Sequence, residues 1–228
     1  MNKGIKVAFG AVIFDAYGTL ISTGNGSVEA AGKILELNGR TDIDPNKFYA
    51  QWKVLHRKHT YSIKNFVTEE KIFETDLREL YNLYKVKGDY KKDVKIMLDT
   101  LGKRKAYPEA KEALEKLAEK YTIAIGSTTD TAPLMSDIEN NRLKVKKVFT
   151  SESLCVYKPR SEFCERILAE LNLQAEEALF VGDSITDDIE GPQRVGMRTC
   201  WINRKGATAG EIQPDFEIND LKELFNFL

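Results

Sequence analysis

The sequence VAFGAVIFDAYGT, residues 7–19, begins with a short apolar run and ends in a polar loop that contains a glycine. An apolar run of this length, bounded by a polar loop, is typical of an interior strand of a parallel sheet. It is far shorter than the roughly 18 residues that a membrane span requires, and no small-residue cleavage pattern follows it. We therefore predict a buried strand over residues 7–14 that places Asp15 at one edge of a sheet.

Downstream of residue 106, short apolar runs alternate with segments of helical periodicity. The runs predict strands over residues 122–125, 147–150, 178–181 and 199–202. The periodic segments predict one helix that opens at Pro108 and others over residues 159–171 and 188–195. Strands and helices that alternate in this way form a parallel sheet with helices on both faces. The predicted fold class is therefore α/β, with a doubly wound, Rossmann-like parallel sheet.

Residues 27–101 show helical periodicity and contain no convincing strand. Four helices are expected there, over residues 28–38, 45–61, 67–84 and 90–101. We predict an α/β core of residues 1–21 and 106–228, interrupted by a helical-bundle cap of residues 22–105. The two crossings between them, near residues 22–26 and 102–106, carry small residues suited to a hinge.

The composition excludes several classes of protein. The chain has 228 residues, of which 42% are hydrophobic and 30% charged, so a packed core is expected. Because 34 basic residues balance 35 acidic ones, no global field attracts nucleic acid or an anionic membrane, and neither is expected as a partner. Cys155, Cys164 and Cys200 have neither the number nor the spacing of a disulfide framework or zinc site. We expect a cytoplasmic protein.

Polar residues follow the predicted strands at the edge where a doubly wound sheet binds its ligands. Asp15 ends the first strand and Ser127 the second, while Asp183 and Asp188 follow the strand over residues 178–181. Lys158 stands just before the helix that leads into that strand. These side chains are expected to meet at one mouth.

In this order and spacing, the residues resemble the four motifs of the haloacid dehalogenase superfamily of hydrolases. The motifs are DAYGT at residues 15–19, Ser127, Lys158 before Pro159, and GDSITDD at residues 182–188. The helical insert after the first motif is similar in position to the helical caps of that superfamily. Together the motifs and the insert account for nearly the whole chain.

The resemblance implies a nucleophile and a metal site. Asp15 would attack the substrate to form a covalent aspartyl intermediate, which divides one difficult displacement into two easier ones. Asp15, Asp183 and the backbone carbonyl of Tyr17 would hold Mg²⁺, a hard cation that prefers oxygen ligands. Asp188 would lie in or just behind the first shell of the metal.

The resemblance also implies a phosphate site. Lys158 would supply positive charge, while Ser127 and Thr19 would donate hydrogen bonds to phosphoryl oxygens. Gly18 and Thr128 are expected beside the same group. The expected function is that of a magnesium-dependent phosphomonoesterase acting on a small phosphorylated metabolite through an aspartyl phosphate.

Position 17 departs from the phosphatase pattern and leaves an alternative open. Phosphatases of the superfamily carry there a second Asp that serves as general acid and base, whereas a Tyr with a pKa near 10 is a poor base at neutral pH. Dehalogenases resemble this chain in having DxYGT, and a departing halide needs no proton. They work without metal, however, and lack the acid at the position of Asp183. They also carry an Arg after a Trp in the cap, where this chain has Trp52 and Lys53.

The cap segment of residues 53–64 contains both histidines and no acid. A basic lid over an anionic substrate is one interpretation, with Lys53 as a substrate-binding residue. A solvated helix face is the other, and we expect it everywhere in this segment except at Lys53.

Parts of the sequence are also compatible with two other functions. The block FVGDSIT at residues 180–186 looks like the nucleophile block of GDSL-type esterases, but no histidine follows His59 to serve Ser184. A catalytically weak protein that binds phosphate or a partner is the other alternative, against which the retention of Asp15, Lys158 and Asp183 argues.

Overall fold

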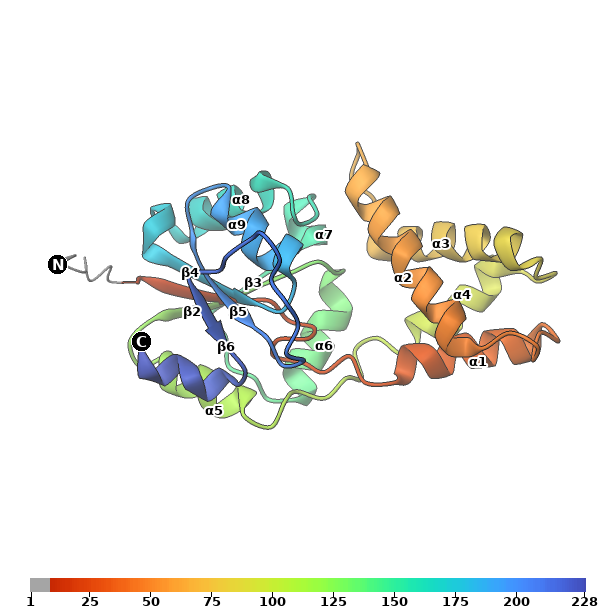
Figure 1. Cartoon of the computed structure of the whole chain (residues 1–228), viewed down its shortest axis with the longest axis horizontal. Coiled ribbons are helices and arrows are strands. Elements are labelled where there is room, and N and C mark those ends of the chain that lie inside the picture. Colours follow the sequence, from red (N-terminus) through yellow and green to blue (C-terminus); the bar gives the residue numbers. More distant parts are fainter. Residues whose placement is uncertain (1–8) are drawn as a thin grey trace.

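The computed structural model describes residues 9–228, which form a sheet-based lobe and a helical lobe joined by two crossings of the chain (Figure 1). The crossings run side by side, because the amide of Ser22 donates to the carbonyl of Lys105 at 2.8 Å and Ile21 pairs with Ala106 in an isolated bridge. The exact division of the chain after residues 21 and 105 stays a prediction.

The sheet has six strands in the order β3-β2-β1-β4-β5-β6, and every neighbouring pair is parallel. The strands are β1 (Ala11–Phe14), β2 (Thr122–Ser127), β3 (Lys147–Thr150), β4 (Ala178–Gly182), β5 (Arg198–Ile202) and β6 (Phe216–Ile218). This order confirms the α/β, doubly wound fold class. Because Phe14 pairs with both Ile125 and Val181, the ends of β1, β2 and β4 open at one edge.

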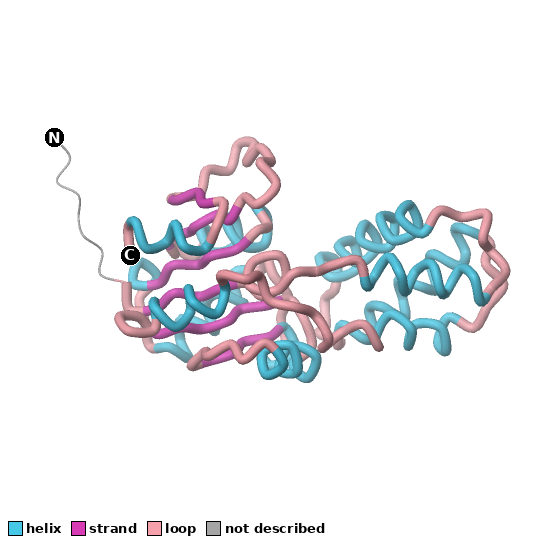
Figure 2. The backbone as a smooth tube through the Cα atoms, turned by 90° about the horizontal axis from the view of Figure 1, so that it is seen from below, coloured by secondary structure: helices cyan, strands magenta, loops and turns pink. Residues whose placement is uncertain are grey.

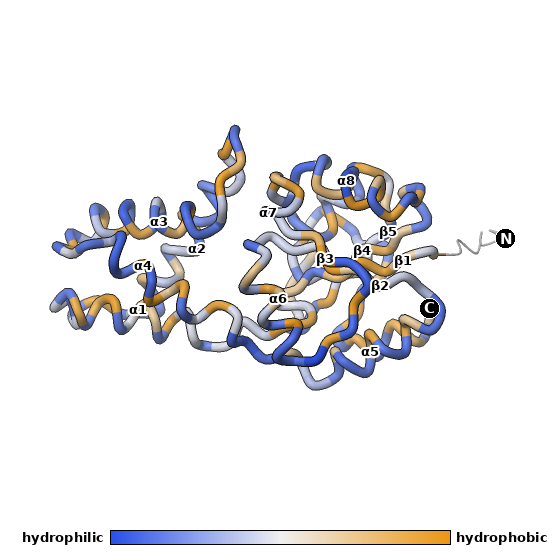
Figure 3. The backbone as a smooth tube through the Cα atoms, turned by 180° about the vertical axis from the view of Figure 1, so that it is seen from behind, coloured by the Kyte–Doolittle hydropathy of each residue, from blue (hydrophilic) through white to orange (hydrophobic). Residues whose placement is uncertain are grey.

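Helices cover both faces of the sheet (Figure 2). On one face lie α5 (Ala110–Leu117), α6 (Thr131–Asn140) and the 3-10 helix η3 (Leu221–Asn226), and on the other lie α7 (Ser151–Leu154) and α8 (Ser161–Leu171). Val12 and Phe14 of β1 pack into the first cluster and Ile13 into the second. Burial on both faces is the physical reason for the continuous apolar run in β1, and Figure 3 shows the strands as the apolar centre of this lobe.

The helical lobe has a core of its own. It consists of α1 (Gly26–Leu37), α2 (Pro45–Ser62), α3 (Glu69–Tyr84) and α4 (Tyr90–Leu98). Phe48, Trp52 and Leu77 are among its largest fully buried side chains. Asp44 caps α2 by accepting from the amide of Asn46 at 2.9 Å, and a proline follows at the first helical position.

Several predicted elements need correction. The helix expected over residues 188–195 has other bounds and another type: it begins as a π-helix (η2, Ile185–Glu190) and ends as a short α9 (Gly191–Gln193). A π-turn widens the helix, and here the amide of Ser184 donates to Asp188 Oδ2 at 2.9 Å, so the carboxylate faces the sheet edge. The last helix of the insert ends at Leu98 rather than at residue 101. Residues 7–8 of the predicted first strand lie outside the described residues.

No sequence pattern predicted α6, α7, β6 or the 3-10 helices η1 (Ala175–Glu177) and η3. Helix α6 buries Asp137 between Leu134 and Ile138, and this charge interrupts the apolar periodicity. Within residues 9–228, no helix combines the length and the apolar character needed to cross a membrane.

Candidate active site

Three carboxylates meet at the carboxyl edge of the sheet. Asp15 follows β1, Asp183 follows β4, and Asp188 comes from the π-helix after it; an oxygen of each lies within 4.8 Å of the others. Asp15 and Asp188 are buried, whereas Asp183 is exposed. The predicted meeting of these residues at one mouth therefore agrees with the geometry.

Lys158 lies between two of these acids. Its Nζ donates to Asp15 Oδ1 at 2.8 Å and to Asp188 Oδ1 at 2.7 Å, and the lysine is only 3% exposed. Burial alone would lower the pKa of Lys158, but the two carboxylates raise it above its ordinary value. Lys158 is therefore charged and holds both acids in position.

The cluster keeps a surplus of negative charge. Burial is the main cause that raises the pKa of Asp15 to about 6, against the attraction of Lys158. Burial, followed by repulsion from Asp188, raises the pKa of Asp183 to about 6. Burial also raises the pKa of Asp188 to about 7. Once the pH exceeds these pKa values, three ionised carboxylates against one ammonium leave two negative charges. The donors are all oxygens, so the site suits a divalent cation such as Mg²⁺.

Gly18 allows the loop of residues 15–19 to pack closely against Asp183. Its φ is +103°, and an ideal Cβ at this position would lie 2.4 Å from Asp183 Oδ2. Atoms cannot approach so closely, so any side chain here displaces the carboxylate. Gly18 thus leaves room for Asp183, and it also lines the larger cavity between the lobes, so the substrate contact expected of it stays a prediction.

The variant Gly18→Ala is expected to lose about 1–3 kcal/mol of unfolding free energy and to push Asp183 away from the cluster. Magnesium should then raise the melting temperature less than in the native protein. Gly24→Ala is the matched control, since Gly24 also has a positive φ, +55°, but an added Cβ meets no atom within 4 Å. Thermal unfolding with and without magnesium checks this, and equal magnesium shifts in both variants would contradict it.

The side chain of Tyr17 forms a hydrogen bond with Asp137 of helix α6. Its hydroxyl donates to Asp137 Oδ2 at 2.9 Å, while the amide of Arg104 donates to Asp137 Oδ1 at 2.7 Å. The Arg104 guanidinium lies 4.6 Å from the centre of the Tyr17 ring. Burial and the Asp137 carboxylate raise the pKa of Tyr17 far above its ordinary value. Tyr17 therefore links the first motif to α6 and to the second crossing, and its proton is poorly available.

The predicted phosphate-binding hydroxyls differ in their positions. Ser127 ends β2 and is buried beside the mouth. Thr128 lines the same cavity as Lys158, and its Oγ1 is buried without a partner among the described residues. Thr19 is fully buried and does not line this cavity, and its carbonyl accepts from Arg204 at 3.0 Å. Thr128 therefore lines the cavity, whereas Thr19 lies in the core, where its Oγ1 also has no partner among the described residues. The phosphate contacts expected of both residues stay predictions.

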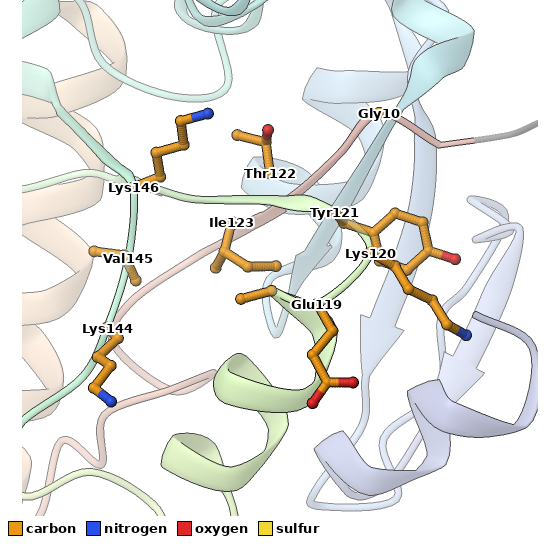
Figure 4. Close-up of a pocket in the computed structure, with 10 residues that line it drawn as sticks. Gly10, Glu119, Lys120, Tyr121, Thr122, Ile123, Lys144, Val145 and Lys146 are labelled. Atoms are coloured by element: carbon orange, nitrogen blue, oxygen red, sulfur yellow. The ribbon is translucent and has the colours of Figure 1, made fainter.

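Two cavities lie between the lobes. The smaller, of about 280 Å³, is lined by Lys158 and Thr128 from the core and by α2 and α3 from the cap. The larger, of about 770 Å³, reaches Gly18 and Asp183. Lys53 lines both. A third hollow, of about 480 Å³, lies at the opposite, amino edge of the strands around Gly10 and Thr122 (Figure 4), away from the carboxylates.

The basic cap segment of residues 53–64 divides between two roles. Lys53, His56 and Arg57 line the smaller cavity. Lys58 instead pairs with Glu79 at 2.9 Å, and His59 bonds Asp76. Lys58 thus lies on a solvated face, as expected. His56 and Arg57 were expected on that face too, but they line the cavity together with Lys53.

Contacts that join the lobes were also missed. Asp130 accepts from the amide of Glu69 at 2.8 Å, at the start of α3, and Thr129 donates to the Glu69 carboxylate at 2.9 Å. Tyr61 donates to Asp187 at 2.6 Å. Asp130, three residues after Ser127, and Asp187, next to Asp188, were the available signals, because residues so close to these motifs lie at the same sheet edge.

Comparison with known proteins agrees with this geometry. A family model described as haloacid dehalogenase-like hydrolase matches residues 12–202. The putative HAD-hydrolase YfnB of Bacillus subtilis is 38% identical over 85 residues, which cover 36% of each chain. The pyrimidine 5'-nucleotidase PynA of Streptococcus pneumoniae is 25% identical over 231 residues, 95% of this chain and 94% of that protein. The chain spans about a third to a half of the length of the first curated relatives it matches.

Solved structures share the fold. The crystal structure of YfnB bound to magnesium superposes with a TM-score of 0.83 at 22% identity, over 97% of this chain and 99% of that one. The L-2-haloacid dehalogenase RSc1362 superposes with a TM-score of 0.81 at 20% identity, over 96% and 98% of the two chains. At these identities the likeness concerns the fold alone.

Proposed function

Because the family match covers residues 12–202, the chain belongs to the haloacid dehalogenase-like hydrolases, and we propose that it is a magnesium-dependent phosphomonoesterase acting on a small phosphorylated metabolite. One observation carries the proposal: Asp183 completes a cluster with Asp15 and Asp188 within 4.8 Å. In a metal-independent enzyme a third carboxylate would only add repulsion to the cluster, which Lys158 and Lys205 offset in part.

In the proposed reaction, Asp15 attacks phosphorus, the P–O bond to the leaving group breaks, and an aspartyl phosphate forms; water then releases phosphate and regenerates Asp15. Lys158 orients the Asp15 carboxylate, and Ser127 and Thr128 donate to the phosphoryl oxygens. Mg²⁺ held by Asp15, Asp183 and the carbonyl of Tyr17, with Asp188 beside it, would supply positive charge for the transferring group.

The leaving group must depart without help from position 17. The Tyr17 proton is held by Asp137, so protonation of an alkoxide, help worth roughly 10²–10⁴ in rate, is missing at this position. We therefore propose that substrates with good leaving groups react faster than simple alkyl phosphates.

The experiment that tests the function is a panel of aryl phosphates, alkyl phosphates and 2-haloacids, each assayed with millimolar magnesium and with excess chelator. Turnover of phosphate esters is expected in magnesium, with a loss of at least about 100-fold in chelator because the surplus charge of the cluster then opposes the phosphate. Magnesium should also raise the melting temperature by mass action. Turnover of phosphate esters that chelator leaves intact would remove the metal from the proposal.

The variant Tyr17→Asp is expected to raise the turnover of alkyl phosphates relative to aryl phosphates, since it adds a general acid and base beside Asp15. Tyr17→Phe is the matched control: it removes only the hydroxyl, leaves the alkyl-to-aryl ratio unchanged, and costs about 1–3 kcal/mol of stability because buried Asp137 loses a donor. Steady-state rates and thermal unfolding check both. A native protein that hydrolyses alkyl phosphates efficiently, and loses this on gaining the Asp, would show that the account of Tyr17 is wrong.

The second candidate is a metal-independent 2-haloacid dehalogenase that uses Asp15 as nucleophile. Tyr17 favours it, because the departure of a halide needs no proton. In that case the 2-haloacids of the panel are turned over equally in magnesium and chelator, and Tyr17→Asp lowers the rate by adding a fourth carboxylate near the cluster.

A further inference from the structure

The smaller cavity between the lobes contains cations that the proposed chemistry does not use. Four side chains with ammonium or guanidinium groups line it: Lys53, Arg57, Arg104 and Lys158. Lys158 is neutralised by Asp15 and Asp188. The other three form no ion pair with any carboxylate of the described chain.

The two acids that line the same cavity, Glu69 and Asp187, interact with other side chains. The Glu69 carboxylate accepts from Thr129 and lies 3.5 Å from the ring of His56, and Asp187 accepts from Tyr61. His56 also contacts buried Asp76 at 2.8 Å, and although burial alone lowers its pKa, these acids raise it to about 9. His56 is thus a cation paired with Glu69 and Asp76. Among the described acids that line the cavity, only Asp187, whose partner is the neutral Tyr61 hydroxyl, is left to balance the three charges of Lys53, Arg57 and Arg104.

The free cations converge from two sides. Lys53 and Arg57 stand four residues apart on α2 and therefore share one face of that helix. Arg104 comes from the second crossing, where it lies against the Tyr17 ring. Three like charges that face one small space repel each other, and an anionic occupant relieves this repulsion.

An unused hydrogen-bond donor lies at the same space. Trp52 lines the cavity, yet it is 1% exposed and its Nε1 has no acceptor among the described residues. A buried donor without a partner costs free energy, which a hydrogen bond to a ligand oxygen would recover. Thr128 Oγ1 is buried in the same way, but it is already assigned to the reacting phosphate.

We propose that the smaller cavity binds a second anionic group of the substrate, a carboxylate or a further phosphate, through Lys53, Arg57 and Arg104. The substrate class is thus a small metabolite with two separated anionic groups, of which the phosphate at Asp15 reacts. The space of about 280 Å³ suits a short carbon skeleton. This inference rests on the proposed function, because it places the reacting phosphate at Asp15.

The test compares substrates matched in the reacting phosphate: glycerol 3-phosphate, 3-phosphoglycerate and propane-1,3-diyl bisphosphate. The second anion is expected to raise kcat/KM about tenfold or more, mainly through a lower KM. The variants Lys53→Ala and Arg57→Ala should bring this ratio toward one. Lys58→Ala, the matched control, should keep it, since Lys58 pairs with Glu79 outside the cavity. Comparison of 3-phosphoglycerate with the bisphosphate shows whether the cavity prefers a carboxylate or a phosphate as the second anionic group.

Calorimetry on the full-length Asp15→Asn protein in magnesium separates this inference from the proposed function. If no phosphate ester is turned over but 3-phosphoglycerate binds more tightly than glycerol 3-phosphate, the function fails and the anion site stands. Equal affinities, or a ratio that Arg57→Ala leaves unchanged, would overturn the anion site.

Discussion

Asp15→Asn is expected to lower phosphate-ester turnover by roughly 10⁴-fold or more, because the amide keeps the shape of the side chain but cannot form the aspartyl intermediate. The measurement is single-turnover hydrolysis of an aryl phosphate in magnesium. Asp187→Asn is the matched control. Asp187 lines the cavity but lies outside the cluster of Asp15, Asp183 and Asp188, so the turnover of this variant should stay within about tenfold of the native value.

The fold should survive this change. Burial raises the pKa of Asp15 to about 6. At neutral pH the ionised Asp15 therefore lowers the free energy of unfolding. A neutral Asn removes that cost, while Lys158 keeps Asp188 as a partner at 2.7 Å. We expect an unchanged or higher melting temperature, and a variant that is inactive because it is unfolded would not support the role of Asp15. Near-native turnover in a folded variant would refute covalent catalysis by Asp15.

Lys158→Met is expected to be the most destabilising single change at the site, with a loss of about 3–5 kcal/mol at neutral pH. It leaves Asp15 and Asp188 buried without their shared cation. Lys58→Met, which removes an exposed ion pair with Glu79, should cost less than about 1 kcal/mol. Denaturant unfolding of both variants checks the difference.

The loss in Lys158→Met should depend on pH. The pKa values of Asp15 and Asp188, about 6 and about 7 in the native protein, already exceed the ordinary value of 3.8 and should rise further without the lysine. An acid with a raised pKa in the folded state binds its proton more tightly there than in the unfolded chain, so stability falls as pH rises through the folded pKa. The variant should therefore be closer to native at pH 5 than at pH 8. A deficit that does not change between these values would contradict the charge argument.

The sequence shows which residue stands at position 17, but only the fold shows what its side chain contacts. The motif DAYGT correctly indicated that the second Asp of the phosphatase pattern is absent. The role of the Tyr17 hydroxyl depends on Asp137, which accepts its hydrogen bond. Asp137 lies 120 residues away, on helix α6, which no sequence pattern predicted. Because a buried acid disguises the apolar face of that helix, no periodicity pointed to the partner of Tyr17.

The sequence by itself determined the sheet edge and the residues that meet there. Apolar runs followed by Asp15, Ser127 and Asp183 predict this, because the carboxyl ends of parallel strands open on one side. Only the tertiary structure decided which cap cations reach the cavity. Lys53, Arg57 and Lys58 lie on the same polar helix, yet only the first two face the core. Composition determines which faces of a helix are polar, but the packing of α2 against α3 and the placement of the lobes decide which polar face meets the substrate.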